Sequence, residues 1–472
     1  MIFVSNRRLL RAARRLITVS LACTASATIR ARPAFAQRAE LARAIDAYIE
    51  PYFATNNFSG QLLVMRSDRV IYQRALGWSN REAHLPMSPE SGLHIASISM
   101  QFTAAAVMRL IDQQKLTIET RVSAIVPEIR GAESITIRNL LEQRSGLSDI
   151  NASPDYAEIV QRHHTPADLV AIIGRDSLLF VPGTQYLHEE HSAYNLLALI
   201  IEKRSGLPFA RAMRKLVLDP AGMRSSGVDD DRVSSREPLA RGYDPSGVDG
   251  VAPTTPIHWS AKSGNASIYS TARDQARWVQ QLFHGKLLSA GSRAAIVDTA
   301  GTPAGYGWFR RPSKRFGEFA YSMSGRSPGF ASYVIYLPRE DITVIAFSNV
   351  YSSATTDIGN DIAAIALGLP VVAIGLRTLP LPPSTLGIDG ARFTFPADFY
   401  QPNATLVFRE GDGEMSLTWP SGDRSPIIPL DRDHAIDRAY WEPIAITRDL
   451  TGRAIAISYD RFTGTRALDV AP

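Results

Sequence analysis

The spacing of apolar residues predicts a helix, a strand pair, a long helical middle and a second group of strands, in that order. Apolar positions recur every three or four residues over 38–53, which is typical of an amphipathic helix. Apolar and β-branched runs at 60–65 and 70–76 flank the polar turn 66–69 and predict a β-hairpin. Further helices are expected at 97–114, 134–141, 192–203 and 271–283, and further strands at 331–337 and 342–348. This order predicts an α/β (α+β) fold in which helices flank an antiparallel sheet built from both ends of the chain.

The last part of the chain has a different pattern, which predicts a separate small β domain. A proline-rich stretch at 379–383 precedes it and marks a boundary. Short strands at 405–409, 414–419, 444–448 and 454–459 favour an all-β barrel or sandwich of roughly 85 residues. Its aromatic residues are interpreted as core, with a lipocalin-like ligand cup as the alternative. These aromatic residues are Phe393, Phe395, Phe399, Tyr400, Trp419, Tyr440 and Trp441.

The first 36 residues have the three parts of an export signal. They begin with basic residues, continue with a modest apolar run at 16–22, and end in Ala34-Phe35-Ala36, a small-x-small cleavage pattern. Asn6-Arg7-Arg8-Leu9-Leu10 also resembles a twin-arginine signal, so the general secretory and twin-arginine routes both stay open. A lipid anchor at Cys23 is not expected, because a serine stands where a lipobox has leucine. We expect an exported, periplasmic or extracellular protein whose mature chain begins near Gln37.

These patterns divide the chain into four segments. Residues 1–36 are the export signal, 37–370 the α/β domain, 371–386 a proline-rich linker, and 387–472 the small β domain. No internal repeat is found.

Composition excludes several classes of protein. The formal net charge is +5, but the first 36 residues carry seven arginines and no acidic residue, so the rest of the chain has a net charge of −2. Nucleic-acid binding is therefore not expected. No apolar run reaches the ~20 residues of a membrane-spanning helix, so an integral membrane protein is not expected either. The single cysteine excludes an intramolecular disulfide and thiolate-rich metal sites, and no cofactor fingerprint is found.

Residues 93–106 carry the strongest signal for chemistry. Ser97 opens the predicted helix, where free N–H groups and the positive end of the helix dipole suit a nucleophile whose product is an oxyanion. The residue at position 100 lies one turn along the same face, where a base could reach the hydroxyl. Ser97 is equally typical of a helix N-cap, in which its hydroxyl bonds a free N–H.

This window and several others resemble the serine β-lactamase and penicillin-binding-protein superfamily, in particular its class C-like esterases and D-amino-acid peptidases. The resemblance covers about residues 40–370. Its matching segments are 60–78, 135–141, 145–147, 182–184, 194–202, 270–274 and 324–330. It implies a β-lactamase/transpeptidase-like sheet with flanking helices and a pocket in which Ser97 is the candidate nucleophile.

The resemblance also implies three catalytic boxes, and this chain departs from all three. Where the family has the lysine of Ser-x-x-Lys, the chain has Met100, which has no amine to accept a proton. Where the family has Tyr-x-Asn or Ser-x-Asn, the chain has His188-Glu189-Glu190 or Glu189-Glu190-His191, depending on the register. Where the family has Lys or His before Thr-Gly, the chain has Met323-Ser324-Gly325.

Backbone groups remain as candidate ligand contacts. The resemblance implies an oxyanion hole at the N–H of Ser97 and at one on the strand near Arg326. Tyr194 follows the second box, and packing on its own helix is favoured over a role as base or ligand contact. Met100 and Met323 are interpreted as packing residues, because methionine fills irregular apolar gaps.

Segment 188–191 has three interpretations. The first is a solvated polar segment at the pocket mouth. The second is a replacement base for Ser97, supplied by His188, Glu189, Glu190 or His191. A zinc site is the third and is disfavoured, because residue 192 is serine and the His-Glu-x-x-His spacing is absent.

The three departures favour a catalytically degenerate member that binds a peptidoglycan-like peptide, an acyl ester or a protein partner. Loss of a general base alone removes a factor of about 10²–10⁴ in rate. The alternative is an active serine hydrolase of the esterase, D-amino-acid peptidase or β-lactamase type, in which a base from 188–191 activates Ser97. A third hypothesis assigns the function to the C-terminal domain, which would dock on a protein partner.

Overall fold

The computed structural model describes residues 34–188, 190–231, 239–297, 304–372, 374, 376 and 381–467. The expected export signal up to residue 33, Cys23, Glu189 and part of the expected linker lie outside the described residues. By its contacts the chain divides into two compact units, Met1–Arg43 and Ala44–Pro472. The sheet, the helices around it and the C-terminal barrel described below all belong to the second unit.

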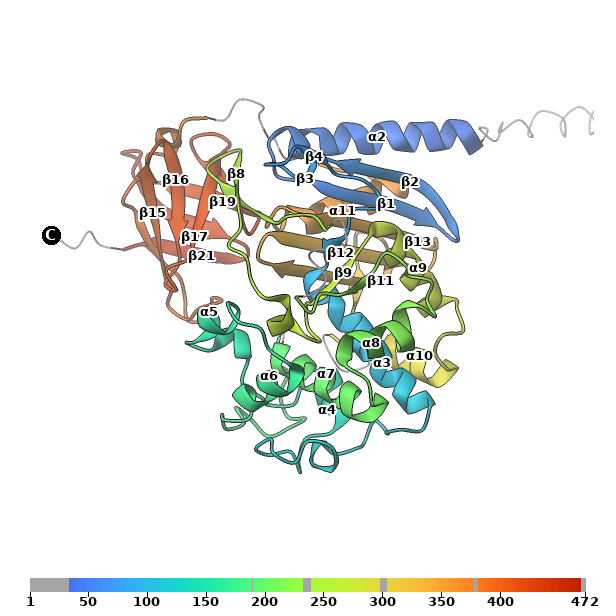
Figure 1. Cartoon of the computed structure of the whole chain (residues 1–472). Coiled ribbons are helices and arrows are strands. Elements are labelled where there is room, and N and C mark those ends of the chain that lie inside the picture. Colours follow the sequence, from blue (N-terminus) through green and yellow to red (C-terminus); the bar gives the residue numbers. More distant parts are fainter. Residues whose placement is uncertain are drawn as a thin grey trace, which may run out of the picture. The chain divides into compact units, whose positions relative to one another are not determined.

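The main sheet has six antiparallel strands and is assembled from both ends of the chain, as predicted. Its strand order is β10-β11-β12-β13-β1-β2, so an early hairpin lies beside four late strands (Figure 1). The strands are β1 (Gly60–Arg66), β2 (Arg69–Leu76), β10 (Phe309–Ser313), β11 (Glu318–Ser327), β12 (Phe330–Leu337) and β13 (Ile342–Ser348). The predicted hairpin is confirmed, since β1 and β2 pair in antiparallel register across the turn that begins at Ser67. The spacing of apolar residues did not predict β10 and β11, because few residues on the outward faces of these two strands are apolar.

Helices cover both faces of this sheet because both carry apolar side chains. On one face, Tyr333 of β12 donates its hydroxyl to Asn360 of helix α11 (Ala354–Ala366) over 2.9 Å. On the other face, Val334 belongs to the core that also contains residues of α3 (Ser99–Asp112), α7 (His191–Ser205) and α9 (Ala272–Phe283). Successive side chains of a strand point to opposite faces, so this alternation assigns every β11 residue to one of the two.

Two predicted helices differ from the observed ones at their starts. The helix expected at 134–141 is confined to α4 (Ile137–Leu141), because Thr136 and Asn139 form a capping box that begins it there. The helix expected from residue 97 begins as a 3-10 turn, η1 (Ala96–Ile98), before α3 starts at Ser99. Of the predicted capping box at Thr271, the hydrogen bond at the N-cap residue is present: the Thr271 hydroxyl accepts the N–H of Asp274, and α9 begins at the next residue.

The remaining helices and strands of the second unit are short, apart from α2, which spans residues of both units. The helices are α2 (Ala34–Ala54), α5 (Tyr156–Ile159), α6 (Pro166–Ile173), α8 (Phe209–Met213) and α10 (Ala290–Val297). The 3-10 segments are η2 (Val122–Ala124), η3 (Ile150–Ala152), η5 (Trp259–Lys262) and η6 (Pro383–Leu386), and η4 (Arg214–Leu218) is a π-helical segment. The strands are β3 (Trp78–Asn80), β4 (Leu85–Pro86), β5 (Leu93–His94), β6 (Gly227–Val228), β7 (Tyr243–Ser246), β8 (Gly250–Pro253) and β9 (Ile268–Ser270). Among the described residues, no helix combines the length and apolarity needed to cross a membrane.

The C-terminal strands close into a barrel of eight antiparallel strands (red in Figure 1). They are β14 (Arg392–Thr394), β15 (Thr405–Gly411), β16 (Glu414–Thr418), β17 (Arg424–Pro429), β18 (His434–Asp437), β19 (Glu442–Arg448), β20 (Ala454–Tyr459) and β21 (Phe462–Arg466). Phe393, Phe395, Phe399 and Trp419 belong to its apolar core, as predicted. Tyr400 and Tyr440 are instead exposed, so the core interpretation is wrong for these two.

The turn between β18 and β19, residues 438–441, joins the barrel to the sheet domain through Arg438. This guanidinium is fully buried and donates to Asn57 Oδ1 at 2.7 Å and to the carbonyl oxygens of Gly247 and Gly250 at 2.8 and 2.6 Å. Burial lowers its pKa to about 10. A buried cation without a carboxylate is tolerated only where many acceptors surround it, so this turn is held in one position.

Candidate functional site

Ser97 lies in the middle of the 3-10 turn η1, directly before the long buried helix α3. Its side chain is 2% exposed, and no described residue hydrogen bonds to its hydroxyl. Ala96 before it has φ of +49°, a conformation that costs a non-glycine residue about 1–3 kcal/mol. The N-cap interpretation of Ser97 is wrong, because the residue that caps α3 is Ile98 and no side chain caps η1. Within this buried turn the N–H of Ser97 has no backbone hydrogen-bond partner.

Met100 occupies the position one turn beyond Ser97. It is fully buried in the apolar core that α3 forms with the neighbouring helices. No amine or carboxylate therefore stands where the resemblance implies the base that activates Ser97.

Strand β11 brings the third box against the serine turn. A Cβ added to Gly325 would lie 2.8 Å from the N of Ser97 and 2.6 Å from the carbonyl oxygen of Ile95, so only glycine allows this approach. Met323 faces the same side of the sheet as Gly325 and is 2% exposed within the apolar core. Ser324 and Arg326 point to the opposite face, where α11 packs. The strand supplies backbone, and no cationic side chain, to the neighbourhood of Ser97.

Glu190, a candidate base, forms hydrogen bonds with a neighbouring loop. It is fully buried, and its carboxylate accepts the hydroxyl of Ser145 at 2.6 Å and the N–H of Ser145 at 3.2 Å. Burial raises its pKa to about 7, although these hydrogen bonds act in the opposite direction. The solvated interpretation of segment 188–191 is therefore wrong for Glu190, and it holds for His188, which is exposed.

His191 begins helix α7 and pairs with a carboxylate. Its Nδ1 lies 3.0 Å from Asp149 Oδ2, which follows the segment 145–147. A carboxylate at Nδ1 holds the proton there and keeps the basic lone pair of a neutral imidazole on Nε2. Tyr194, one turn further along α7, is fully buried and donates its hydroxyl to the carbonyl oxygen of Leu141, an arrangement typical of packing. Its burial raises its pKa, so it stays protonated.

Sequence reasoning missed a polar cluster next to His191. Lys262 is buried at the end of η5, where its ammonium donates to Asn151 Oδ1 at 3.2 Å and to the hydroxyl of Tyr156. Burial raises the pKa of Tyr156, and nearby Tyr351 and Asp149 raise it further. The sequence signal was weak: the chain has six lysines against many arginines, and Lys262 precedes a Ser-Gly pair outside the expected box.

Arg326, near the end of β11, stacks on Tyr351. Its guanidinium carbon is 4.1 Å from the ring centre of Tyr351 and 4.6 Å from that of Tyr440, which comes from the barrel turn 438–441. We call Ser97, Met100, Met323 and Gly325 the serine region, and His191, Lys262, Tyr156, Tyr351 and Arg326 the charged region. The first is apolar and closed, and the second holds polar groups.

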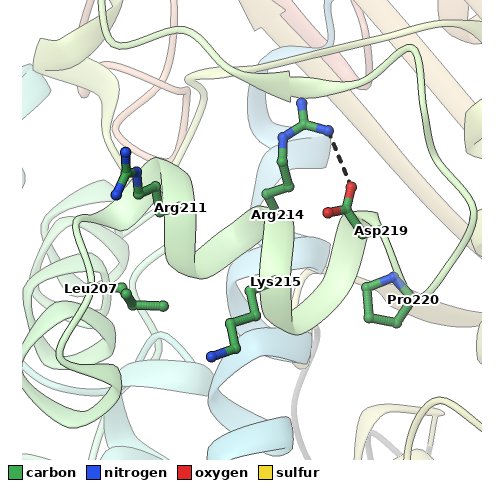
Figure 2. A pocket seen from close by; sticks show the side chains of 6 residues that line it. All are labelled: Leu207, Arg211, Arg214, Lys215, Asp219 and Pro220. Atoms are coloured by element: carbon green, nitrogen blue, oxygen red, sulfur yellow. Dashed lines mark hydrogen bonds and ion pairs between the residues drawn. The ribbon is translucent and has the colours of Figure 1, made fainter.

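A separate surface pocket of about 500 Å³ lies on α8 and η4. It is lined by Leu207, Arg211, Arg214, Lys215, Asp219 and Pro220. Figure 2 shows Arg214 turned toward Asp219, with which it pairs at 3.1 Å, while Arg211 and Lys215 point elsewhere. None of these residues belongs to the serine region or the charged region, so the candidate site is not placed here. Among the described residues, no group of three or more His, Cys, Asp or Glu side chains is arranged to hold a metal ion.

Comparison with known proteins agrees with this geometry. The model of the family described as beta-lactamase matches residues 15–368. The chain belongs to the beta-lactamase family. PbpX of Bacillus subtilis (strain 168) is 28% identical over 309 residues, which cover 65% of this chain and 74% of PbpX. The D-aminopeptidase of Gluconobacter oxydans (strain 621H) is 24% identical over 323 residues, which cover 66% of this chain and 59% of that enzyme.

A solved structure shows the same fold. The crystal structure of the penicillin binding protein from Bacillus halodurans matches with a TM-score of 0.60 and 23% identity, over 68% of this chain and 98% of that one. The expected β-lactamase/transpeptidase-like fold is thus confirmed, and the C-terminal barrel follows the part that matches the family model. In this member of the beta-lactamase family, Met100 and Met323 stand at the positions that the resemblance assigns to the lysine of the first box and the cation of the third.

Proposed function

We propose that this member of the beta-lactamase family binds a peptide or acyl-ester ligand beside Ser97 and has lost fast acyl transfer. One observation carries the proposal: fully buried, apolar Met100 stands where the base is needed, and the hydroxyl of Ser97 has no hydrogen-bond partner among the described residues. The ligand class is supported by relatives whose names refer to D-amino-acid and penicillin chemistry.

Two further contacts support loss of catalysis. Glu190 is occupied by Ser145, and Met323 replaces the cationic residue of the third box with an apolar side chain. Removal of several members of a catalytic unit costs more than about 10⁴-fold in rate.

Covalent labelling tests the proposal. The mature protein and its Ser97→Ala variant are incubated with a fluorescent penicillin and with a fluorophosphonate, and intact masses are recorded. We expect no adduct on either protein. A Ser97-dependent adduct on the wild-type protein within minutes would contradict the proposal. The double variant Met100→Lys/Met323→His serves as the control for access, because labelling of this variant at Ser97 shows that the probe reaches the serine.

A second candidate function rests on the His191–Asp149 pair at 3.0 Å. An imidazole oriented by a carboxylate is the usual general base of serine hydrolases, so an active hydrolase would use His191 as the relocated base. In that case the fluorophosphonate adduct on Ser97 appears in the wild-type protein and is slowed at least about 100-fold by His191→Gln. An adduct rate unchanged by His191→Gln rejects this candidate.

We also propose that the protein is exported, on the strength of the leader pattern in residues 1–36. Mass spectrometry of the protein purified from its native cells is expected to give an N-terminus near Gln37. A full-length N-terminus would reject export by cleavage of this signal.

A further inference from the structure

We propose that the surface pocket on α8 and η4 binds a phosphate ester, whose phosphate group is recognised by Arg211, Arg214 and Lys215. The ester is either a small molecule in solution or the headgroup of a lipid, and both sources present the same chemistry to the pocket. None of the lining residues belongs to the serine region or the charged region, so this second site does not depend on the function proposed above.

The pocket concentrates positive charge in a chain that has no excess of it elsewhere. Its six lining residues include three cations and one carboxylate, which leaves a local charge of +2. After the first 36 residues, the chain has 44 basic and 46 acidic residues. A hollow lined by one sign of charge raises the local concentration of ions of the opposite sign. The occupant expected here is therefore an anion.

Arg211 and Lys215 are the two cations that a ligand can neutralise. Both side chains are exposed, and with the residues that the structure describes neither forms a hydrogen bond or an ion pair. Figure 2 shows both extending away from the pair that Arg214 makes with Asp219. An anion in the pocket would give these two cations the counter-charge that the described chain does not supply.

The carboxylates beside the pocket already have partners. Asp219 Oδ1 lies 3.1 Å from Arg214 Nη1, and Arg214 Nη2 donates to the carbonyl oxygen of Ser226 at 3.0 Å. These two contacts fix the Arg214 guanidinium in one orientation. Glu202, in the last turn of α7, accepts the N–H of Phe209 at 2.7 Å and thus caps the start of α8. Neither acid takes the place that a ligand anion would occupy between Arg211 and Lys215.

A π-helical turn produces this arrangement. The segment η4 follows α8 without a break, and the N–H of Asp219 donates to the carbonyl oxygen of Arg214, five residues earlier, at 2.9 Å. This turn brings the Asp219 carboxylate beside Arg214, while Arg211 and Lys215, four residues apart, share the exposed side of the segment. The three residues after Lys215 are buried, which anchors the segment in the core. π-helical turns are rare and are frequent at functional sites.

The lining favours a phosphate ester over other anions. A phosphate monoester carries about −1.5 to −2 charges at neutral pH, which matches the local charge of +2. Its three terminal oxygens can accept from several cations at once, whereas a carboxylate has two oxygens. The pocket volume of about 500 Å³ is typical of small-molecule sites and exceeds the needs of inorganic phosphate. Leu207 and Pro220 add apolar lining, so the ligand is expected to have an organic part.

Calorimetric titration tests the assignment. Glycerol 3-phosphate is titrated into the mature protein at low salt and about pH 8, where the phosphate carries close to two charges, and glycerol is the uncharged control ligand. We expect glycerol 3-phosphate to bind and glycerol not to bind. The double variant Arg211→Met/Lys215→Met should weaken binding of glycerol 3-phosphate at least about 10-fold, because it removes two donors of charge-assisted hydrogen bonds.

A matched variant separates the pocket from the net charge of the protein. Arg424→Met/Lys286→Met removes one arginine and one lysine from exposed positions that do not line the pocket. It should leave the affinity for glycerol 3-phosphate within about 2-fold, because exposed charges outside the pocket are screened. Thermal unfolding of each variant confirms that it is folded.

Vesicles distinguish a lipid ligand from a soluble one. Phosphatidylcholine vesicles with and without phosphatidic acid, whose headgroup is a phosphate monoester, are sedimented with each protein. Cosedimentation that requires phosphatidic acid and is lost in Arg211→Met/Lys215→Met identifies the ligand as a lipid. Binding of glycerol 3-phosphate without cosedimentation identifies it as a soluble ester.

Three results would overturn the proposal and leave the proposed function untouched. The first is that the protein binds neither glycerol 3-phosphate nor the vesicles with phosphatidic acid. The second is that Arg211→Met/Lys215→Met binds as well as the wild-type protein. The third is that Arg424→Met/Lys286→Met weakens binding as much as the pocket variant, because the effect would then come from net charge.

Discussion

The serine region and the charged region have opposite compositions. Around Ser97, methionines fill the positions of the family's bases and cations, and the side chains are closed to solvent. In the charged region, Lys262, His191 and Arg326 are held by amide, carboxylate and aromatic partners. Polar groups are costly to bury, so a chain keeps them where they have a use. The difference is one of environment: apolar side chains pack around Ser97, and the charged region buries polar groups together with their partners.

The largest effect is expected from separating the barrel from the charged region. Arg438→Met removes the buried donors that join the turn 438–441 to Asn57, Gly247 and Gly250 and leaves those acceptors unpaired. We expect the free energy of unfolding to fall by about 4 kcal/mol, measured by urea denaturation.

Arg424 provides the control for this experiment. It is an exposed arginine on β17 of the same barrel. Arg424→Met should change the free energy of unfolding by no more than about 0.5 kcal/mol. If Arg438→Met were equally mild, the barrel would not depend on this contact.

The next effect tests whether the serine region is committed to apolar packing. Met100→Lys places an ammonium in a fully buried site without a carboxylate, and we expect it to lower the free energy of unfolding by about 3 kcal/mol. Met100→Leu conserves volume and should cost less than about 1.5 kcal/mol. Thermal unfolding of the two variants side by side gives the comparison. A lysine tolerated as well as the leucine would mean that the region still accommodates the family's base.

The last effect concerns Glu190 and the dependence of stability on pH. Burial raises its pKa from 4.5 to about 7, so the folded state keeps a proton that the unfolded state loses in this interval. The stabilising contribution of this group is thus fully present below pH 4.5 and is lost as the pH rises to about 7. Glu190→Gln does not titrate, and the difference in unfolding free energy between wild type and variant should change by up to about 3 kcal/mol across the interval.

Chemical denaturation at a series of pH values measures this change. Glu90→Gln, at an exposed position, is the control and should follow the wild-type curve. A difference between wild type and Glu190→Gln that stays constant with pH would show that Glu190 titrates alike in the folded and unfolded chain.

The spacing of apolar residues predicted most of the fold, because helices and strands both bury apolar side chains at regular intervals. The hairpin of β1 and β2, the late strands β12 and β13, helix α9 and the barrel strands β15, β16, β19 and β20 all lie where apolar spacing placed them. The starts of α3 and α4 were missed by two or three residues, because local capping and a 3-10 turn decide where a helix begins.

For the candidate site too, some features could be predicted from the sequence and others required the structure. Met100 and Met323 could be identified as departures from the family boxes by their place in the sequence alone. The partners of Glu190 and His191 could not, because Ser145 and Asp149 are more than forty residues away in the chain. Lys262 and Tyr351 were missed because no local pattern marks a residue whose partners come from other elements.

The sequence by itself determined the class of fold and marked Ser97, Met100 and Met323 as residues to examine, because these depend on local pattern and on residue type. The tertiary structure decided which polar side chains have hydrogen-bond or ion-pair partners within the protein. In the folded chain the carboxylate of Glu190 accepts a hydrogen bond from Ser145, and His191 pairs with the carboxylate of Asp149. Arg326 lies between Tyr351 of the sheet domain and Tyr440 of the barrel. Hydrogen bonding and charge pairing depend on distances of a few ångströms between residues far apart in the chain, and only the folded chain sets those distances.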